Sequence, residues 1–166
     1  TGPLAGTRMP GSGTFSVTTL GACTEMCGTA QANGFFGAFM RQNGIDGLIL
    51  QGQAPEWTRL HIEDGRLSLL PAAGLLGLDT WETEEAVQKE IGRRCSVFSI
   101  GPAGENLVRF AAICGDKGHV AAHNGVGAVM GAKRVKCLSC VKGERRPPVV
   151  DPARLSENAK KLAAFS

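Results

Sequence analysis

Glycine is the residue that most constrains this chain, because 23 of its 166 residues are glycine, roughly twice the usual share. The glycines follow no three-residue period, which excludes a collagen-like helix. An apolar content of 43% is too high for a disordered chain. Two uses of the glycines are open at this point. They serve only tight turns and close packing, or they let the backbone approach a ligand closely.

Composition also narrows the functional classes. Tyrosine is absent and aromatic residues make up 5%, which argues against an aromatic platform for nucleic-acid bases. No apolar run approaches 18 residues and no signal peptide is visible, so we expect no membrane span and a cytoplasmic protein. A Gly-Pro turn at residues 2–3 normally follows a strand, and we therefore expect the chain to be truncated at its N-terminus.

The pattern predicts an α+β domain over residues 1–143, mostly antiparallel sheet with a few short helices, and a linker with the start of a following helix over 144–166. Asp64-Gly65 predicts a hairpin, and Asp79 with Glu82 predicts a capped helix. We expect strands at 13–20, 45–50, 56–62, 66–70, 95–100, 107–114 and 135–142, helices at 35–42, 79–91 and 127–132, and loops at 21–33 and 115–127.

A weak internal similarity suggests two repeats. The Gly-Pro turn at residues 2–3 resembles that at 101–102, and Gly-Ala-x-Met at 37–40 resembles the run at 127–130. The similarity predicts that residues 1–52 and 101–143 form similar units related by a pseudo-twofold axis. Chance resemblance in a glycine-rich chain is the alternative.

Six cysteines lie at positions 23, 27, 95, 114, 137 and 140, and without a secretory signal we expect reduced thiols. Cys23, Cys27, Cys137 and Cys140 could together supply four thiolates to zinc or to an iron–sulfur cluster. The alternative is structural, since Cys137 and Cys140 lie in a strand-like run and would point to opposite faces of a sheet.

Two small-residue loops each lead into a short helix, at 31–34 and at 119–125. Free backbone N–H groups at such places suit phosphate. Walker and Rossmann patterns are missing, so ordinary nucleotide binding is unsupported. His119 and His123 could bond phosphate or could simply be exposed, and Glu105-Asn106 suggests a polar turn that fixes the backbone.

Five runs in order resemble the N-terminal domain of the tungsten-containing aldehyde ferredoxin oxidoreductases, over about residues 1–143. The most specific are Ile-Gly-Pro-Ala-Gly-Glu-Asn at 100–106 and Gly-Val-Gly-Ala-Val-Met-Gly at 125–131. The other three are Gly-Pro-Leu-Ala-Gly-Thr at 2–7, Gly-Phe-Phe-Gly at 34–37 and Leu-Asp-Thr-Trp-Glu-Thr-Glu at 78–84.

The resemblance implies a base for a bis-pterin tungsten or molybdenum cofactor, whose two phosphates are bridged by magnesium. It implies oxidation of aldehydes to acids with ferredoxin as acceptor, and a 4Fe-4S cluster held by later domains, so that this segment alone is inactive. The implied partners are the remaining domains, ferredoxin or an electron-transfer subunit, and a second copy in a homodimer. The aligned cofactor-binding positions are Thr14, Gln31, Ala32, Asn33, Gly34, His119, Val120, Ala121, His123, Asn124 and Gly125.

Three of these positions depart from the family pattern. Thr14, His119 and His123 stand where the family usually has arginine, so backbone groups should dominate the grip on phosphate, and histidine would add charge only at low pH. The departures leave two alternatives to aldehyde oxidation. One is a relative acting on another substrate, such as an aromatic acyl thioester, and the other is a non-catalytic metal-binding or scaffold module.

Overall fold

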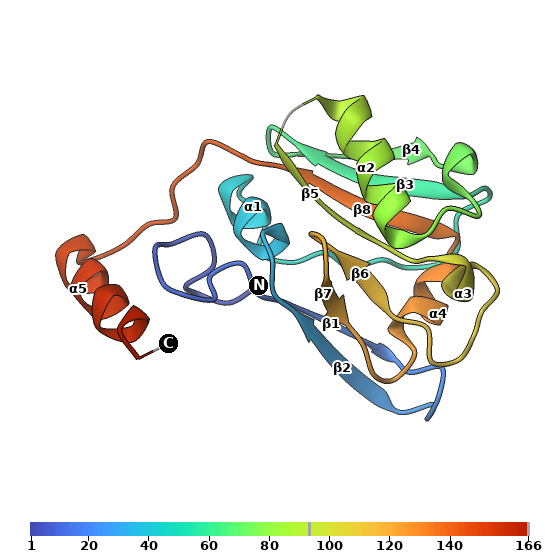
Figure 1. The fold of residues 1–166 in the computed structure, drawn as a ribbon, viewed down its shortest axis with the longest axis horizontal. Coiled ribbons are helices and arrows are strands. Elements are labelled where there is room, and N and C mark those ends of the chain that lie inside the picture. The colour runs from blue at the N-terminus through green and yellow to red at the C-terminus, as the bar shows by residue number, and fades with distance from the viewer. Residues whose placement is uncertain (93, 166) are drawn as a thin grey trace.

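A six-stranded mixed sheet organises the fold, in a computed structural model that describes residues 1–92 and 94–165 (Figure 1). The strand order is β4-β3-β8-β5-β6-β7, in which β3 and β8 run parallel and all other neighbours are antiparallel. The strands are β3 (Thr58–Glu63), β4 (Arg66–Pro71), β5 (Cys95–Ser99), β6 (Ile113–Gly115), β7 (His119–Ala121) and β8 (Val135–Val141). A separate hairpin joins β1 (Phe15–Leu20) to β2 (Cys27–Ala32).

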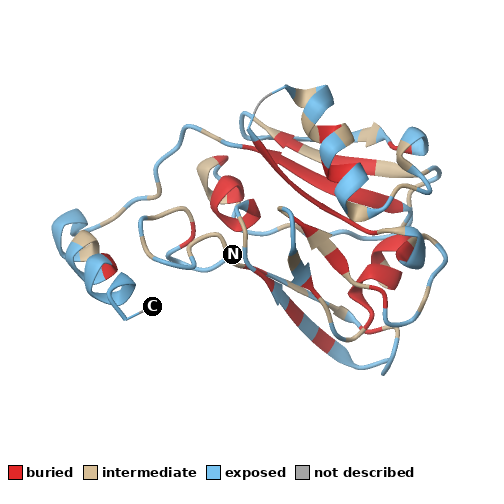
Figure 2. Ribbon diagram, in the orientation of Figure 1, coloured by how far each residue is buried: buried red, intermediate tan, exposed pale blue. Residues whose placement is uncertain are grey.

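Helices cover both faces of this sheet. Helix α2 (Thr80–Ile91) packs on one face, where Val87 meets Cys95 and Val97. Helices α1 (Phe36–Gln42) and α4 (Val126–Ala132) lie on the other face with the β1–β2 hairpin, around the main core. Strands β5 and β8 are buried along their whole length (Figure 2). The predicted α+β fold, with a mostly antiparallel sheet and few short helices, is confirmed.

Local signals explain several elements. Asp64 and Gly65 both have positive φ, 50° and 75°, as a two-residue hairpin between β3 and β4 requires. The Asp79 carboxylate accepts hydrogen bonds from the N–H groups of residues 81 and 82, and the Glu82 side chain accepts from the Asp79 N–H, which completes the predicted capping box of α2. Gly92 ends this helix in the left-handed conformation.

Four sequence predictions are wrong. The expected loop at 21–33 contains β2, and the expected loop at 115–127 contains β7. Strand β2 is too rich in small residues, and β7 is too short, to show an alternation of apolar and polar residues in the sequence. The strand expected at 45–50 is irregular because no neighbouring strand pairs with it in the described chain. Of the strand expected at 107–114 only the end forms β6, and the unexpected helix α3 (Pro102–Glu105) precedes it.

The predicted duplication is not shown. Each proposed unit has a hairpin followed by a seven-residue helix, β1–β2–α1 and β6–β7–α4. However, β1 and β2 form their own sheet, and the first unit has no closing strand equivalent to β8.

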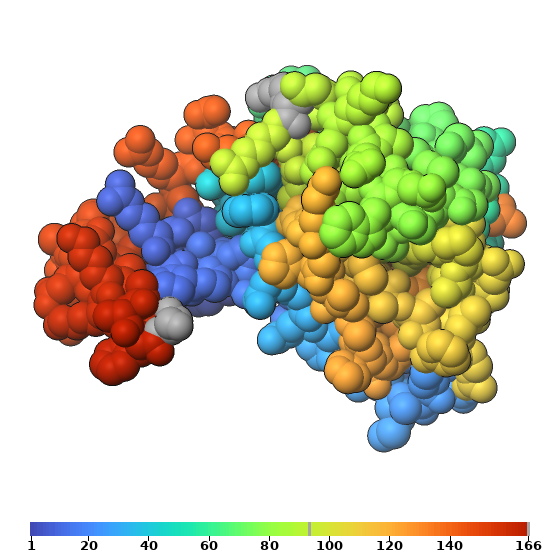
Figure 3. Space-filling model, in the orientation of Figure 1, coloured from blue at the N-terminus to red at the C-terminus, as the bar shows by residue number. Residues whose placement is uncertain are grey.

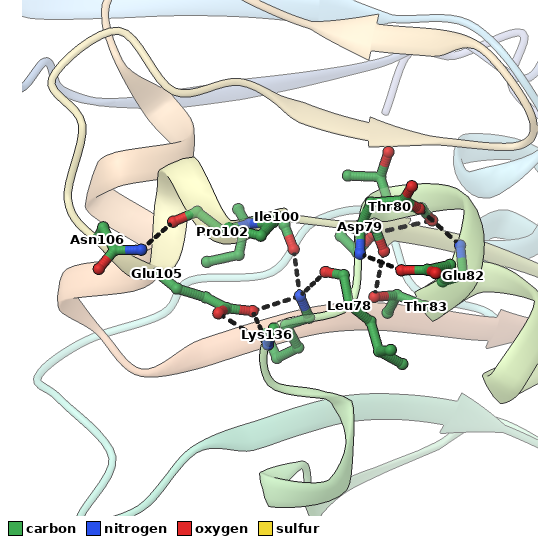
Figure 4. A network of polar contacts seen from close by, with 12 residues as sticks. Leu78, Asp79, Thr80, Glu82, Thr83, Ile100, Pro102, Glu105, Asn106 and Lys136 are labelled. Atoms are coloured by element: carbon green, nitrogen blue, oxygen red, sulfur yellow. Dashed lines mark hydrogen bonds and ion pairs between the residues drawn. The ribbon is translucent and has the colours of Figure 1, made fainter.

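A buried ion pair connects β8 to the α3 turn (Figure 4). Lys136 is fully buried, and its Nζ donates to Leu78 O at 2.8 Å, to Ile100 O at 2.7 Å and to Glu105 Oε1 at 2.5 Å. The Glu105 carboxylate also accepts from the Gly77 N–H. The Glu105-Asn106 turn thus fixes the backbone, as the sequence suggested.

The C-terminal helix stands apart from the sheet. After β8, residues 142–150 form no regular element, and α5 (Pro152–Ala163) follows with Asp151 as its N-cap. The C-terminal segment, in red, lies beside the N-terminal residues, in blue (Figure 3). Among residues 1–92 and 94–165, none of the helices has the length and apolar character needed to cross a bilayer.

Candidate functional site

The first predicted binding segment lies at the end of β2. Gln31 and Ala32 are the last residues of the strand, with Gln31 exposed and Ala32 buried against the core. Asn33 and Gly34 connect it to α1, and Gly34 has a φ of 101°, which an L side chain rarely adopts. The segment is therefore held between a hairpin and a helix rather than in a free loop.

The second segment includes β7 and the turn before α4. His119 to Ala121 form β7, in which Val120 is exposed and Ala121 is buried opposite Ile113. His123, Asn124 and Gly125 follow with φ values of 69°, 57° and 70°. A side chain at Gly125 would place its Cβ 1.8 Å from Arg109 O, so this glycine is required by packing within the chain itself.

The two segments lie next to each other, since β2 and β7 are in contact. A hollow of about 410 Å³ is lined by Thr14, Asn33, Gly34 and His119, together with the glycine-rich residues 11–13, Phe35 and Ala38. Inside it the Thr14 hydroxyl donates to Asn33 Oδ1 at 2.7 Å. Further along the hairpin, Asn124 packs so closely over Gly28 that a Cβ there would lie 2.6 Å from the Asn124 side chain.

One acidic group that no sequence pattern predicted borders this hollow. Asp116 accepts hydrogen bonds from the Phe35 N–H at 2.6 Å and from Ser96 Oγ at 2.8 Å. A carboxylate therefore already occupies the first backbone donor of α1, and in α4 the Gly127 N–H donates to Ala111 O. The Phe35 and Gly127 amides are therefore not free for phosphate, while binding of phosphate at the two helix starts stays a prediction.

A cation lies at the same border. The Arg94 guanidinium stacks over Phe35 at 5.0 Å from the ring centroid and over Phe39 at 5.8 Å. Phe35 lines the hollow, so this arginine brings positive charge near its wall. Sequence reasoning missed Arg94, Phe35 and Asp116, because only the fold brings them to the segment around Asn33.

The structure does not bring all predicted residues into the hollow. His123 is exposed on the turn before α4, and Gln31 and Val120 point to solvent from their strands. Conversely, Ser12 and Gly13 line the hollow although the prediction named only Thr14 in this segment. Their Gly-Ser-Gly-Thr run at 11–14 was the available signal.

The four cysteines considered as metal ligands differ in exposure: Cys137 and Cys140 are buried, whereas Cys23 and Cys27 are exposed. Cys137 packs in the core under α2, whereas Cys140 packs in the core on the other face of the sheet, as predicted from their spacing. Burial raises the pKa of both thiols to about 12, so they stay protonated. Cys23 and Cys27 are exposed at the tip of the β1–β2 hairpin, where Cys23 Sγ donates to Arg109 O. Because Cys137 and Cys140 point to opposite faces, the four cysteines cannot hold one metal ion together.

Comparison with known proteins identifies the class. Residues 1–142 match the model of the aldehyde ferredoxin oxidoreductase N-terminal domain, and the chain belongs to this family. The chain is 41% identical over 151 residues to the tungsten-containing aldehyde ferredoxin oxidoreductase of Thermococcus kodakarensis, and 38% identical over 151 residues to that of Pyrococcus furiosus. Both alignments cover 90% of this chain and 25% of the relative, so the chain spans about a quarter of the length of these enzymes.

A solved structure is similar throughout the fold. The active-site complex BamBC of benzoyl-coenzyme A reductase, in complex with 1,5-dienoyl-CoA, superposes with a TM-score of 0.91 at 30% identity. The match covers 98% of this chain and 25% of that chain.

Proposed function

We propose that this chain is the cofactor-binding part of a tungsten oxidoreductase, and that the hollow between the β2 end and β7 receives the pterin phosphates. The observation that carries the proposal is that Thr14, Asn33, Gly34 and His119, far apart in sequence, line one hollow. Membership of a family whose relatives are named as tungsten-containing enzymes supports the metal.

The residues present fit such a group. The hollow has small or neutral polar walls, which let a ligand approach the backbone, and the side-chain donors at hand are the Asn33 Nδ2 group and the His119 imidazole, since the Thr14 hydroxyl already donates to Asn33 Oδ1. The Arg94 guanidinium at the border adds positive charge that suits phosphate. When bound, a tungsten–pterin cofactor would supply the redox chemistry. The chain's own residues orient it and pair its charge.

Negative charge limits the site on one side. Asp116 holds the Phe35 N–H, so an anionic ligand must sit toward Thr14 and His119 rather than at the start of α1. We infer that Gly34, with its left-handed backbone, places the Asn33 amide toward the ligand.

The test uses the full-length protein. Replacing His119 and His123 together by Ala should lower tungsten and pterin content, measured after gel filtration, several-fold, because the variant removes an imidazole donor that lines the hollow. The matched control is His61→Ala, since His61 lies on β3, bonded to Ser139 and outside the hollow. Equal metal and pterin content in wild type and double variant would remove any role for the histidines. If the Asn33→Leu variant also kept its tungsten and pterin content, the hollow would not be the cofactor-binding site.

We propose that the full-length protein oxidises aldehydes, with ferredoxin as the electron acceptor. We further propose that it is a cytoplasmic homodimer whose remaining domains hold a 4Fe-4S cluster. A second candidate is reduction of an aromatic acyl thioester, which the similarity to benzoyl-coenzyme A reductase favours. Assays of the full-length protein with an aldehyde plus oxidised ferredoxin, and with benzoyl-CoA plus a low-potential reductant, separate the two.

A further inference from the structure

The turn between β6 and β7 carries Asp116 and reaches the start of α1 (Figure 1). One carboxylate oxygen of Asp116, Oδ2, accepts from the Phe35 N–H at 2.6 Å and from Ser96 Oγ at 2.8 Å. Phe35 directly follows the first predicted binding segment, at 31–34, and His119, three residues after Asp116, begins the second. The Asp116 side chain therefore connects the two segments whose residues line the hollow.

The turn itself is fixed to the sheet and to α2. Asp116 and Lys117 both have positive φ, 44° and 54°, and the Asp116 N–H donates to Val97 O of β5 at 3.2 Å. The Lys117 N–H donates to Glu84 Oε2 of α2 at 3.0 Å, and Glu84 is buried. Ser96, which donates to the carboxylate, is fully buried on β5. Contacts with the protein interior thus determine where the Asp116 carboxylate lies.

The segment before α1 depends on this carboxylate. Helix α1 has Phe35 as its N-cap residue, and a phenylalanine side chain has no oxygen with which to cap a helix. Gly34 has a φ of 101° and passes so close to Asp116 that a Cβ there would lie 2.5 Å from Oδ2. Glycine loses more conformational freedom on ordering than other residues. A contact that orders Gly34 and Phe35 in advance removes this cost from ligand binding.

We propose, on the basis of the function proposed for the hollow, that Asp116 is a positioning residue for the cofactor. It holds the segment of Asn33 and Gly34 beside His119, so that the hollow has its binding shape before the cofactor enters. Asp116 is not one of the residues that line the hollow, so it acts through Gly34 and Phe35 rather than by touching the ligand. Both of its bonds end on one oxygen, and an uncharged amide oxygen at the same place would accept them equally well.

The first test measures the tungsten and pterin content of the full-length protein after gel filtration and dialysis. Asp116→Ala should lower both contents about ten-fold, because a hydrogen bond from the backbone to a charged group is lost. Asp116→Asn should keep the wild-type content or exceed it, since its amide oxygen accepts both bonds and a negative charge near the phosphates is removed. Wild-type content in Asp116→Ala, or an equal loss in the Ala and Asn variants, would overturn the proposal.

The matched control is Asp64→Ala. Asp64 occupies the equivalent place in the turn between β3 and β4, with a φ of 50°, so its replacement carries the same backbone strain at a turn that does not border the hollow. This variant should keep the wild-type content of tungsten and pterin. A loss equal to that of Asp116→Ala would show that turn strain, not the bond to Phe35, causes the effect, and would overturn the proposal.

Hydrogen–deuterium exchange of the cofactor-free full-length protein separates positioning from unfolding. In Asp116→Ala the Phe35 amide should exchange about ten-fold or more faster than in wild type, while the amides of β8 exchange at the wild-type rate. In Asp116→Asn both should be unchanged. A Phe35 amide that is unaffected in Asp116→Ala would overturn the proposal. Faster exchange throughout β8 would also overturn it, because Asp116 would then act by stabilising the whole domain.

The Asn33→Leu variant distinguishes this inference from the function on which it rests. Loss of tungsten and pterin from Asn33→Leu but not from Asp116→Ala would overturn the positioning role and leave the hollow as the binding site. Retention in both variants would overturn both. Loss in both, with retention in Asp116→Asn and Asp64→Ala, is the expected result.

Discussion

Removal of the buried Lys136 ammonium is expected to destabilise the domain strongly. The Lys136→Met variant keeps most of the side-chain volume but loses three hydrogen bonds, to Leu78 O, Ile100 O and Glu105. Glu105 retains only its bonds from the Gly77 N–H, and its carboxylate is 12% exposed. The variant thus leaves a charge with little solvent and two carbonyl oxygens without their donor.

The magnitude follows from this geometry. Breaking a buried pair by removing one partner costs about 3–5 kcal/mol, mostly from the uncompensated charge that remains. With a urea dependence of about 2 kcal/mol per molar, the unfolding midpoint should fall by roughly 2 M. The double variant Lys136→Met with Glu105→Gln should recover part of this loss, because the stranded charge is gone.

Urea unfolding followed by tryptophan fluorescence measures the effect, since Trp57 packs against the main core. Lys142→Met is the matched control. Lys142 lies just after the same strand and is exposed, so a change within about 0.5 kcal/mol is expected. A loss below about 1 kcal/mol for Lys136→Met, similar to the control, would show that the network adds little and would refute the reasoning.

Three further outcomes follow from the structure. The Arg59 guanidinium, bonded to the Glu90 carboxylate, holds the pKa of Glu90 below its usual value. The pair therefore stabilises the fold above the usual carboxyl pKa, and this stability is lost as pH falls through the lowered pKa, so Glu90→Gln should flatten the acid side of a stability–pH curve. Gly125→Ala should lower the unfolding midpoint far more than Gly92→Ala. Both glycines have a positive φ, 70° and 64°, but only a Cβ at Gly125 would clash with the backbone, so similar losses of stability, about 1–2 kcal/mol in both variants, would contradict this. Native thiol labelling at pH 8, read by mass spectrometry, should modify the exposed Cys23 and Cys27 first, and early labelling of the buried Cys95, Cys137 or Cys140 would count against the fold.

Elements with their own local chemistry were predictable from the sequence. The capping box starting at Asp79 and the Asp64-Gly65 turn each determine the backbone through contacts within a few residues. The Gly-Ala-x-Met runs likewise predicted two short helices. For the candidate site, the sequence predicted the segments around Asn33 and His119 as cofactor-binding, which stays a prediction, and in the structure Asn33 and His119 line one hollow.

The remaining parts depend on long-range partners. Strand β2 alternates Gly28, Ala30 and Ala32 on its buried face, and such small side chains produce no hydrophobic period in the sequence. The apolar run at 45–50 has the opposite property, since it is rich in isoleucine and leucine but pairs with no strand among the described residues. Asp116 and Arg94 reach the hollow only through the sheet, so no local pattern could identify them.

The position of β8 has a consequence for how this chain is made. The last strand of the sheet in sequence lies at its centre, between β3 and β5. Until residue 141 has been synthesised, the β3–β4 hairpin and the β5–β6–β7 meander share no hydrogen-bonded neighbour. At about 5–20 residues per second, translation from the end of β3 to the end of β8 takes roughly 4–16 s. In that interval the β3–β4 hairpin, joined from residue 121 on by the β5–β6–β7 meander, lacks its central strand, so holding chaperones should bind the nascent chain between these two points and leave once β8 is in place.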